Sequence, residues 1–211
     1  MTVVLKLGGS VITDKDTPET VDDDALGAAV DAIAAADPDR LVLVHGGGSF
    51  GHVAAADRGI SREAGSRDAA DVWAVHDAMR RLNDAVLRRL HDAGVAAVPV
   101  HPLSVAARDE GDALALPLDS TATLLGEGFV PVLHGDVVGH AGAGATVVSG
   151  DELVTRLAAG LDADRVGLCS TVTGVYDDDG EVIPRITEFD AVADAVGGSE
   201  STDVTGGMAA K

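Results

Sequence analysis

Residues 41–52, LVLVHGGGSFGH, join a mostly apolar run of strand length to a cluster of glycines. The run Leu41–His45 is typical of a strand that is buried on both faces, because it has no alternating polar face to present to water. Glycines after a strand let backbone N–H groups approach an anion, and a helix that begins there favours negative charge. This stretch therefore predicts a buried strand that ends in an anion-binding turn.

Outward from this stretch, strand patterns alternate with helical patterns along the chain. Strand patterns occur at Thr2–Leu7, Ala96–Val100, Phe129–His134 and Arg165–Ser170, and helical patterns at Asp22–Ala36, about Asp68–Asp92, Ser120–Leu125, Asp151–Gly160 and Glu188–Val196. Residues 135–149 have the pattern of a β-hairpin that turns around His140–Gly144, and a second hairpin is expected to turn at Asp177–Gly180. The alternation predicts an α/β domain whose mostly parallel sheet is covered by helices on both faces, with β-hairpin insertions.

The charge balance limits the possible partners. The chain has 35 Asp and Glu against 15 Lys and Arg, for a formal net charge of −20. An acidic surface of this kind keeps a protein hydrated in concentrated salt, and it argues against nucleic acid or an anionic membrane as a partner. The single cysteine, Cys169, leaves no intramolecular disulfide, and no segment has the pattern of a membrane span or a signal peptide. We therefore expect a halophilic, cytoplasmic protein.

Lysine is rare and its positions are informative. The chain has three lysines, Lys6, Lys15 and Lys211, and each lies in or beside a glycine-rich segment. KLGGS at residues 6–10 follows a strand pattern, and GGMAAK at residues 206–211 resembles another helix start. A lysine ammonium beside free backbone amides is suited to binding phosphate. The lysines therefore predict a phosphate-binding site.

Two common phosphate-binding motifs do not account for this pattern. Gly46, Gly48 and Gly51 match the dinucleotide pattern G-x-G-x-x-G, but the acidic residue that should end the next strand is missing, because Asp68 and Asp71 begin a helical pattern. That motif also gives Lys6 and Lys211 no role. The Walker A pattern is absent, since no glycine is followed by Lys-Ser or Lys-Thr.

Segments along the whole chain resemble the amino acid kinase family and, within it, the isopentenyl phosphate kinases. They occur in the family's order: KLGGSVITDK at 6–15, HGGGSFGH at 45–52, HGDVV at 134–138, SGDELVTRLA at 149–158, TVTGVY at 171–176 and TGGMAAK at 205–211. His52, after GGGSFG, indicates the branch whose acceptor is itself a phosphate or phosphonate.

This resemblance implies a three-layer αβα sandwich as one domain over residues 1–211. The acceptor would bind to about residues 1–140 and ATP to about residues 141–211, usually in a homodimer. The family's chains continue past the segment that matches TGGMAAK, so we expect the nucleotide half to be truncated at its C-terminus.

The resemblance also implies roles for individual residues. Lys6 and Lys211 would neutralise the transferring γ-phosphoryl group, Lys15 would contact the ATP phosphates, and Asp151 would hold Lys6 and Lys211 in place. His52 would donate to the acceptor phosphate beside Gly51, together with the amides of Gly46, Gly47 and Gly48. The remaining residues of the ATP site would be Gly8, Gly9 and Ser10 at the phosphates, and Thr171, Gly174, Tyr176, Gly206 and Gly207. Mg²⁺ is expected as the counter-ion of ATP, with no direct metal ligand from the protein.

The expected activity is transfer of the ATP γ-phosphoryl group to isopentenyl phosphate, in the archaeal mevalonate route to isoprenoids. No general base is required, because the acceptor is already ionised and phosphoryl transfer depends mainly on alignment and charge stabilisation. One alternative is a kinase of the same fold for a phosphonate such as fosfomycin or a carboxylate such as N-acetylglutamate. Another is a non-catalytic nucleotide-binding regulatory or storage subunit.

Other polar and apolar residues favour structural roles. Trp73, His76, Met79 and Val86 share one face of the long predicted helix, which favours core packing over an alkenyl pocket. His45, His134 and His140 are expected to be structural.

Overall fold

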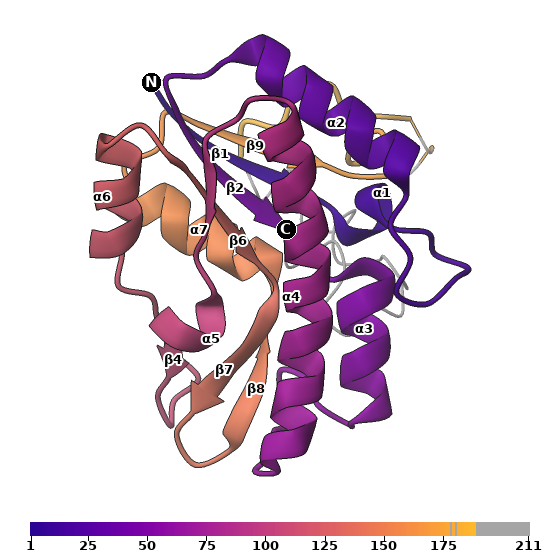
Figure 1. Ribbon diagram of the computed structural model, residues 1–211, viewed down its shortest axis with the longest axis vertical. Helices are drawn as coiled ribbons and strands as arrows, with labels where there is room; N and C mark the ends of the chain where they lie inside the picture. The colour runs from indigo at the N-terminus through magenta and orange to yellow at the C-terminus, as the bar shows by residue number, and fades with distance from the viewer. Residues whose placement is uncertain (178, 180, 189–211) are drawn as a thin grey trace.

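The computed structural model describes residues 1–177, 179 and 181–188 (Figure 1). Within them, a five-stranded parallel sheet has the strand order β3-β6-β2-β1-β9. Its strands are β1 (Thr2–Leu7), β2 (Arg40–His45), β3 (Ala97–Pro99), β6 (Val130–His134) and β9 (Arg165–Cys169). Each strand lies within two residues of its predicted bounds.

A second, four-stranded sheet has the order β5-β4-β7-β8. Its strands are β4 (Ala107–Arg108), β5 (Leu114–Ala115), β7 (Asp136–His140) and β8 (Gly144–Val148). The antiparallel pair β7 and β8 is the hairpin predicted for residues 135–149. Only Gly135 separates β6 from β7, so the end of one sheet leads directly into the other.

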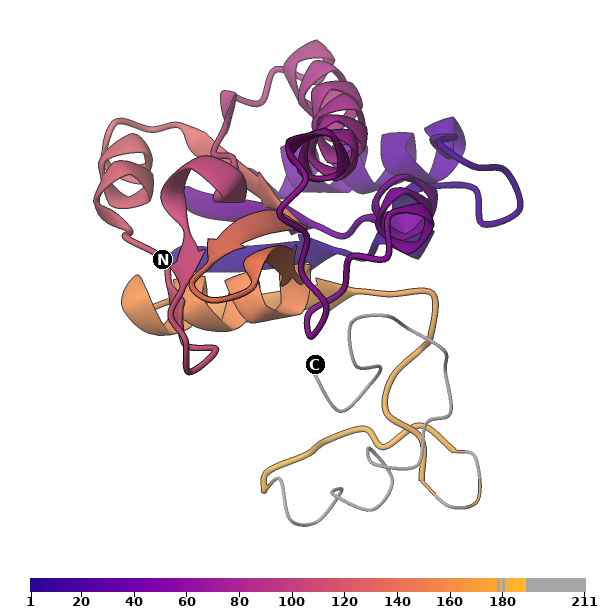
Figure 2. The same ribbon diagram turned by 90° about the horizontal axis from the view of Figure 1, so that it is seen from below.

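Helices cover both faces of the parallel sheet. The helices of the described part of the chain are α1 (Gly9–Ile12), α2 (Asp23–Ala36), α3 (Gly48–Asp57), α4 (Ala69–Asp92), α5 (Pro102–Val105), α6 (Asp119–Gly126) and α7 (Gly150–Gly160). Figure 2 shows α7 on the opposite side of the sheet from α2 and α4. The predicted αβα fold with a mostly parallel sheet is confirmed.

The sequence of β2 explains why this sheet lies in the centre. Leu41 and Leu43 pack into the cluster that contains residues of α2 and α4. Val42 and Val44 pack into the cluster that contains residues of α6 and α7. All of them are at most 2% exposed. Burying a side chain of this size contributes about 1.5–3 kcal/mol, so β2 is held from both sides.

Polar residues mark the starts of the main helices, close to where the sequence predicted them. The Asp22 side chain accepts a hydrogen bond from the Ala25 amide before α2, Asp68 accepts one from Ala70 before α4, and Ser149 accepts one from Glu152 before α7. These caps satisfy amides that the helix itself leaves unpaired.

The second predicted hairpin is described only in part. Tyr176 and Val182 form an antiparallel bridge, and the Asp177 amide donates to the Glu181 carbonyl. Positions 178 and 180 of its turn lie outside the described residues, as does the predicted helix Glu188–Val196 beyond its first residue. The short elements α1, α5, β4 and β5 had not been predicted.

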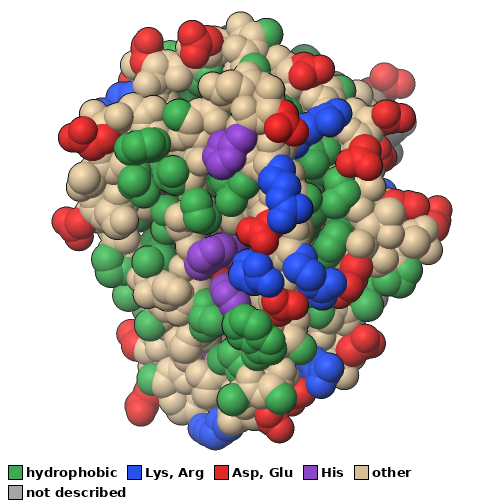
Figure 3. All heavy atoms as spheres, in the orientation of Figure 1, with side chains coloured by type: hydrophobic (Ala, Val, Ile, Leu, Met, Phe, Trp, Pro, Cys, Tyr) green, Lys and Arg blue, Asp and Glu red, His purple; other side chains and the backbone are tan. Residues whose placement is uncertain are grey.

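The surface carries mixed charges over α4. Figure 3 shows basic and acidic side chains next to one another on this face of the molecule. Arg80 contacts Asp77 and Asp84, and Arg81 contacts Glu19 and Asp77. In the described part of the chain, no helix combines the length and the apolar character needed to cross a membrane.

Candidate functional site

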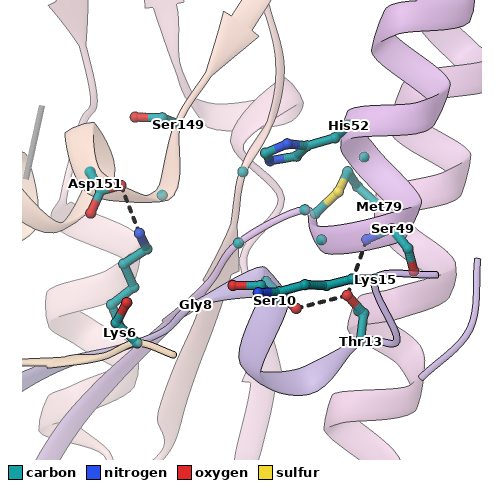
Figure 4. Close-up of a pocket in the computed structure, with 18 of the residues that line it drawn as sticks. Lys6, Gly8, Ser10, Thr13, Lys15, Ser49, His52, Met79, Ser149 and Asp151 are labelled. Carbon is teal, nitrogen blue, oxygen red and sulfur yellow. Dashed lines mark hydrogen bonds and ion pairs between the residues drawn. The ribbon is translucent and has the colours of Figure 1, made fainter. Parts of the chain in front are cut away.

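A cavity of about 830 Å³ lies at the carboxyl ends of β1, β2 and β6. This is where open parallel α/β sheets bind their ligands, because the turns that follow neighbouring strands meet there. Its walls come from the glycine turns after β1 and β2, the start of α7 and one face of α3 and α4 (Figure 4).

Most of the site residues inferred from the sequence line this cavity. They are Lys6, Gly8, Gly9, Ser10, Lys15, Gly46, Gly47, Gly48, Gly51, His52, Asp151, Thr171 and Tyr176. Gly174 does not line it; a Cβ atom there would lie 2.8 Å from Val182 Cγ1, so Gly174 packs closely against Val182. Gly206, Gly207 and Lys211 lie outside the described residues.

A buried ion pair forms one wall of the cavity. Lys6 Nζ lies 2.6 Å from Asp151 Oδ2, and both residues are 8% exposed. Lys6 lies two residues after Val4 in β1, so it points to the face of the sheet that α7 covers. The N-terminus of α7 also favours the Asp151 carboxylate. The second Asp151 oxygen, Oδ1, is buried with no partner among the described residues.

The glycine turns after β1 and β2 are in direct backbone contact. A Cβ atom on Gly9 would lie 2.1 Å from the Gly48 nitrogen, so only glycine fits there. Gly48 itself has a φ of +48°, a left-handed conformation that favours glycine. The two anion-binding turns predicted from the sequence therefore meet at one place.

Thr13 joins these two turns, and sequence reasoning missed it. Its hydroxyl donates to the Gly9 carbonyl at 2.8 Å and accepts from the Ser49 amide at 3.0 Å. The second contact spans 36 positions of the chain. No local pattern announces such a contact, although Thr13 lies inside the KLGGSVITDK segment.

Two amides expected to bind phosphate are already used within the fold. The Gly46 amide donates to the Leu7 carbonyl at 3.0 Å, and the Gly8 amide donates to the Cys169 carbonyl at 2.9 Å. Each of these bonds extends the parallel pairing of the strands by one residue. The expectation that the amides of Gly46 and Gly8 bind phosphate is therefore wrong. The remaining candidates for binding phosphate are the amides of Gly47 and Gly48 after β2 and those of Gly9 and Ser10 after β1.

His52 lies across the cavity from Lys6, on α3 and beside Met79 (Figure 4). A Cβ atom on Gly51 would lie 2.5 Å from Met79 Sδ, so this glycine lets α3 and α4 approach closely. Met79 is 2% exposed and also lines the cavity, so it belongs to the core and to the site.

The other members of the predicted α4 face differ from one another. Val86 is fully buried, as expected for core packing. The core prediction is wrong for Trp73, which is 59% exposed, because the buried residues of α4 begin only at Val75. His76 is 8% exposed, and its Nδ1 lies 3.0 Å from both carboxylate oxygens of Asp136. The hydrogen bond that His76 donates to the Asp136 carboxylate raises the pKa of His76.

Lys15 is exposed on the loop after α1 and reaches the same cavity. Its neighbour Asp14 accepts a hydrogen bond from the Asp16 amide, which lowers the Asp14 pKa and keeps this carboxylate ionised. The two lysines that the structure describes thus share one cavity, Lys6 from within the sheet and Lys15 from its rim.

Among residues 1–177, 179 and 181–188, no three His, Cys, Asp or Glu side chains are grouped so as to hold a metal ion. Asp151, which lines the cavity, already has one oxygen on Lys6. This carboxylate is therefore already engaged by a cation of the protein.

The chain is similar to known proteins over almost its whole length. A family model described as "Amino acid kinase family" matches residues 1–211. The isopentenyl phosphate kinase of Haloferax volcanii is 68% identical over 99% of this chain and 85% of its own length. That of Methanocaldococcus jannaschii is 34% identical over 99% of this chain and 84% of its own. A crystal structure titled "X-ray structures of isopentenyl phosphate kinase" is similar with a TM-score of 0.82 and 30% identity, covering 93% of this chain and 84% of that one.

Proposed function

The chain belongs to the amino acid kinase family, and from that premise we propose that it transfers the γ-phosphoryl group of ATP to isopentenyl phosphate. The observation that carries this proposal is the single cavity in which the buried Lys6–Asp151 pair lies opposite His52 and the glycine turn after β2. High identity to isopentenyl phosphate kinases over almost the whole chain supports the same acceptor.

In this proposal the acceptor phosphate binds at the start of α3. The amides of Gly47 and Gly48 and the His52 side chain are the donors there, and the helix N-terminus favours the negative charge. The ATP phosphates bind at the amides of Gly9 and Ser10 with Lys15, and Thr171 and Tyr176 lie on the nucleotide side. The acceptor half would comprise about residues 1–140 and the nucleotide half about residues 141–211.

The chemical step needs no proton acceptor. An ionised oxygen of isopentenyl phosphate attacks the γ-phosphorus, the bond from that phosphorus to the β–γ bridging oxygen breaks, and ADP leaves with the electron pair. Charge on the equatorial oxygens is what the protein must stabilise. A cation about 4 Å from such an oxygen contributes roughly 4 kcal/mol before desolvation at an effective dielectric near 20. Lys6 supplies that cation, and Lys211, outside the described residues, is proposed as a second.

Asp151 has a positioning role in this step. Its carboxylate fixes the Lys6 ammonium, and its unpaired Oδ1 leaves room for a second donor, for which Lys211 is the proposed partner. Mg²⁺ would travel with ATP and reduce the charge of its phosphates. We also propose a halophilic, cytoplasmic setting and a homodimer.

An acceptor screen tests the proposal. ADP release would be measured with Mg·ATP in molar KCl, with isopentenyl phosphate, fosfomycin, N-acetylglutamate and no acceptor in parallel. We expect turnover that depends on isopentenyl phosphate, and formation of isopentenyl diphosphate. Turnover on fosfomycin or N-acetylglutamate alone would show that this compound, and not isopentenyl phosphate, is the acceptor. ATP binding without turnover on any acceptor would favour a non-catalytic nucleotide-binding subunit.

A further inference from the structure

Two adjacent strands each end in a histidine that is followed by a glycine. These two His-Gly pairs lie on the side of the cavity where the acceptor is proposed to bind. His45 ends β2 and His134 ends β6, and the two residues are partners in the parallel pairing of these strands. Both side chains are fully buried, and their rings stack with centroids 5.5 Å apart. Neither ring lines the cavity, but the glycine after each one does.

Each ring contacts the carbonyl oxygen of its own glycine. His45 Nδ1 lies 3.1 Å from the Gly46 oxygen, and His134 Nδ1 lies 2.9 Å from the Gly135 oxygen. A carbonyl oxygen can only accept, so Nδ1 must carry the proton in both rings. Burial lowers the pKa of His45 to about 4 and also lowers that of His134, so both rings are neutral. Each Nε2 atom then has only a lone pair, which needs a donor.

For His134 the donor is another histidine. His101 Nδ1 lies 2.9 Å from His134 Nε2, so His101 donates and His134 accepts. His101 is half-buried after β3 and lies on the side of the network closer to solvent. The order of donation is therefore His101 to His134 to the Gly135 carbonyl.

For His45 the donor must come from Asn83 on α4. Asn83 Oδ1 lies 3.1 Å from His45 Nε2, whereas Asn83 Nδ2 is buried with no partner among the described residues. An acceptor facing a lone pair gains nothing, and a half-turn of the amide places Nδ2 on His45 Nε2 instead. This turn gives the buried amide nitrogen a partner and leaves Nδ1 of His45 free to donate to Gly46.

We propose that Asn83 and His101 act as positioning residues for acceptor binding, because through His45 and His134 they fix the peptide groups that follow Gly46 and Gly135. The peptide bonds of the described residues are trans, so the carbonyl and the N–H of one peptide point in opposite directions. His45 does not line the cavity, and it holds the Gly46 carbonyl on its own side. The Gly47 amide therefore faces the cavity. The Gly46 amide is held as well, by Leu7, so the turn cannot rotate without breaking buried bonds. This inference rests on the proposed function.

The proton positions can be measured without any turnover. Long-range ¹H–¹⁵N spectra of the ¹⁵N-labelled, unmodified protein at pH 7 report which ring nitrogen is protonated, and single substitutions assign the signals. We expect His45 and His134 both to carry the proton on Nδ1, which is the minor tautomer of histidine in water. A proton on Nε2 in His45 would overturn the role given to Asn83, whatever the acceptor of the enzyme is.

Two substitutions of His45 separate its two nitrogens. In His45→Asn the side-chain amide takes the place of Nδ1 and can still donate to the Gly46 carbonyl, whereas in His45→Gln it takes the place of Nε2 and loses that bond. We expect His45→Gln to raise the KM for isopentenyl phosphate about tenfold, with an unchanged KM for ATP, and His45→Asn to raise it at most about threefold. Asn83→Leu removes the donor to Nε2 and should raise the same KM.

His91→Asn, which loses the Nε2 contact of the His91 ring, is the matched control. That ring also contacts a backbone carbonyl, that of Ala97 at 2.7 Å, but it does not line the cavity. We expect this variant to leave the acceptor KM unchanged. Equal acceptor KM values for His45→Gln and His45→Asn would overturn the proposal. Absence of turnover on isopentenyl phosphate by the unmodified protein would instead refute the proposed function and leave the measured tautomers as they are.

Discussion

The two walls of the cavity are built from opposite kinds of chemistry. On the wall of β1 and α7, a charged lysine and a charged aspartate are buried in contact at 2.6 Å. On the wall of β2 and β6, the buried groups are neutral histidines, an asparagine and glycine carbonyls. In the proposed reaction the first wall contacts the phosphoryl group while it is transferred. The second wall only binds the acceptor phosphate.

This difference matters most in concentrated salt. At about 1 M salt the screening length is roughly 3 Å, so remote charges neither attract nor repel the substrates. Only groups in direct contact can stabilise them. The Lys6 ammonium, held by the buried Asp151 carboxylate, is one such group. The glycine amides, held through the buried neutral histidine rings, are the others.

Removing the charged group should have the largest effect. Lys6→Ala deletes the cation proposed to contact the transferred phosphoryl group, and we expect kcat to fall about 10³-fold. Arg156→Ala is the control, because Arg156 is an exposed cation on the same helix as Asp151. Steady-state ADP release with saturating substrates measures both variants. A loss below about tenfold for Lys6→Ala would remove Lys6 from the chemical step.

Removing the donor on the opposite wall should have a smaller effect of a different type. His52→Ala removes one proposed donor to the acceptor phosphate, so we expect kcat/KM for isopentenyl phosphate to fall about 10²-fold while ATP affinity is kept. ATP binding would be measured by calorimetry beside the kinetics. His140→Ala, on the β7–β8 hairpin outside the cavity, is the control. Loss of ATP binding in His52→Ala would mean that His52 binds ATP and not the acceptor.

The neutral wall should also make the protein sensitive to acid. The folded pKa of His45 is about 4 against an ordinary value of 6.5. Because the folded state binds this proton less readily, stability is full above pH 6.5 and is lost as the pH falls from there toward 4. The expected loss between pH 7.5 and pH 5 is about 2 kcal/mol from this one residue.

Urea unfolding at both pH values, in molar KCl, measures this loss. His45→Asn does not titrate, so its stability should change less between the two pH values. His76 acts in the opposite direction, since its raised pKa makes its contact with Asp136 stronger in acid. An equal loss in His45→Asn and the unmodified protein would mean that His45 is not the group that titrates.

The sequence predicted the charged wall better than the neutral one, for a physical reason. Lys6 and the glycine turns lie in local segments whose composition already indicates phosphate chemistry, and the role of Asp151 was implied by the resemblance to the amino acid kinase family. The contacts of Thr13 with Ser49 and of His45 with Asn83 join positions 36 and 38 residues apart, and only the fold brings them together. The amides of Gly8 and Gly46 were wrongly assigned for the same cause, since their partners lie on neighbouring strands. The main strands and helices were predicted well, because apolar runs and capping residues are local signals.

The smallest effect is expected for an ion pair of the same length as Lys6–Asp151 but on the surface. Arg81 Nη1 lies 2.6 Å from Glu19 Oε2, and the two side chains are 44% and 39% exposed. Water and salt already solvate both charges, so Arg81→Ala should lower the free energy of unfolding by less than about 1 kcal/mol, and by less still in molar KCl. Asp151→Asn leaves the Lys6 ammonium buried without its carboxylate and should cost roughly 3–5 kcal/mol. Urea unfolding of both variants at low and high salt makes the comparison. If the two losses were equal, contact distance rather than burial would determine the strength of ion pairs in this protein. The buried Lys6–Asp151 pair would then contribute no more to stability than a surface pair.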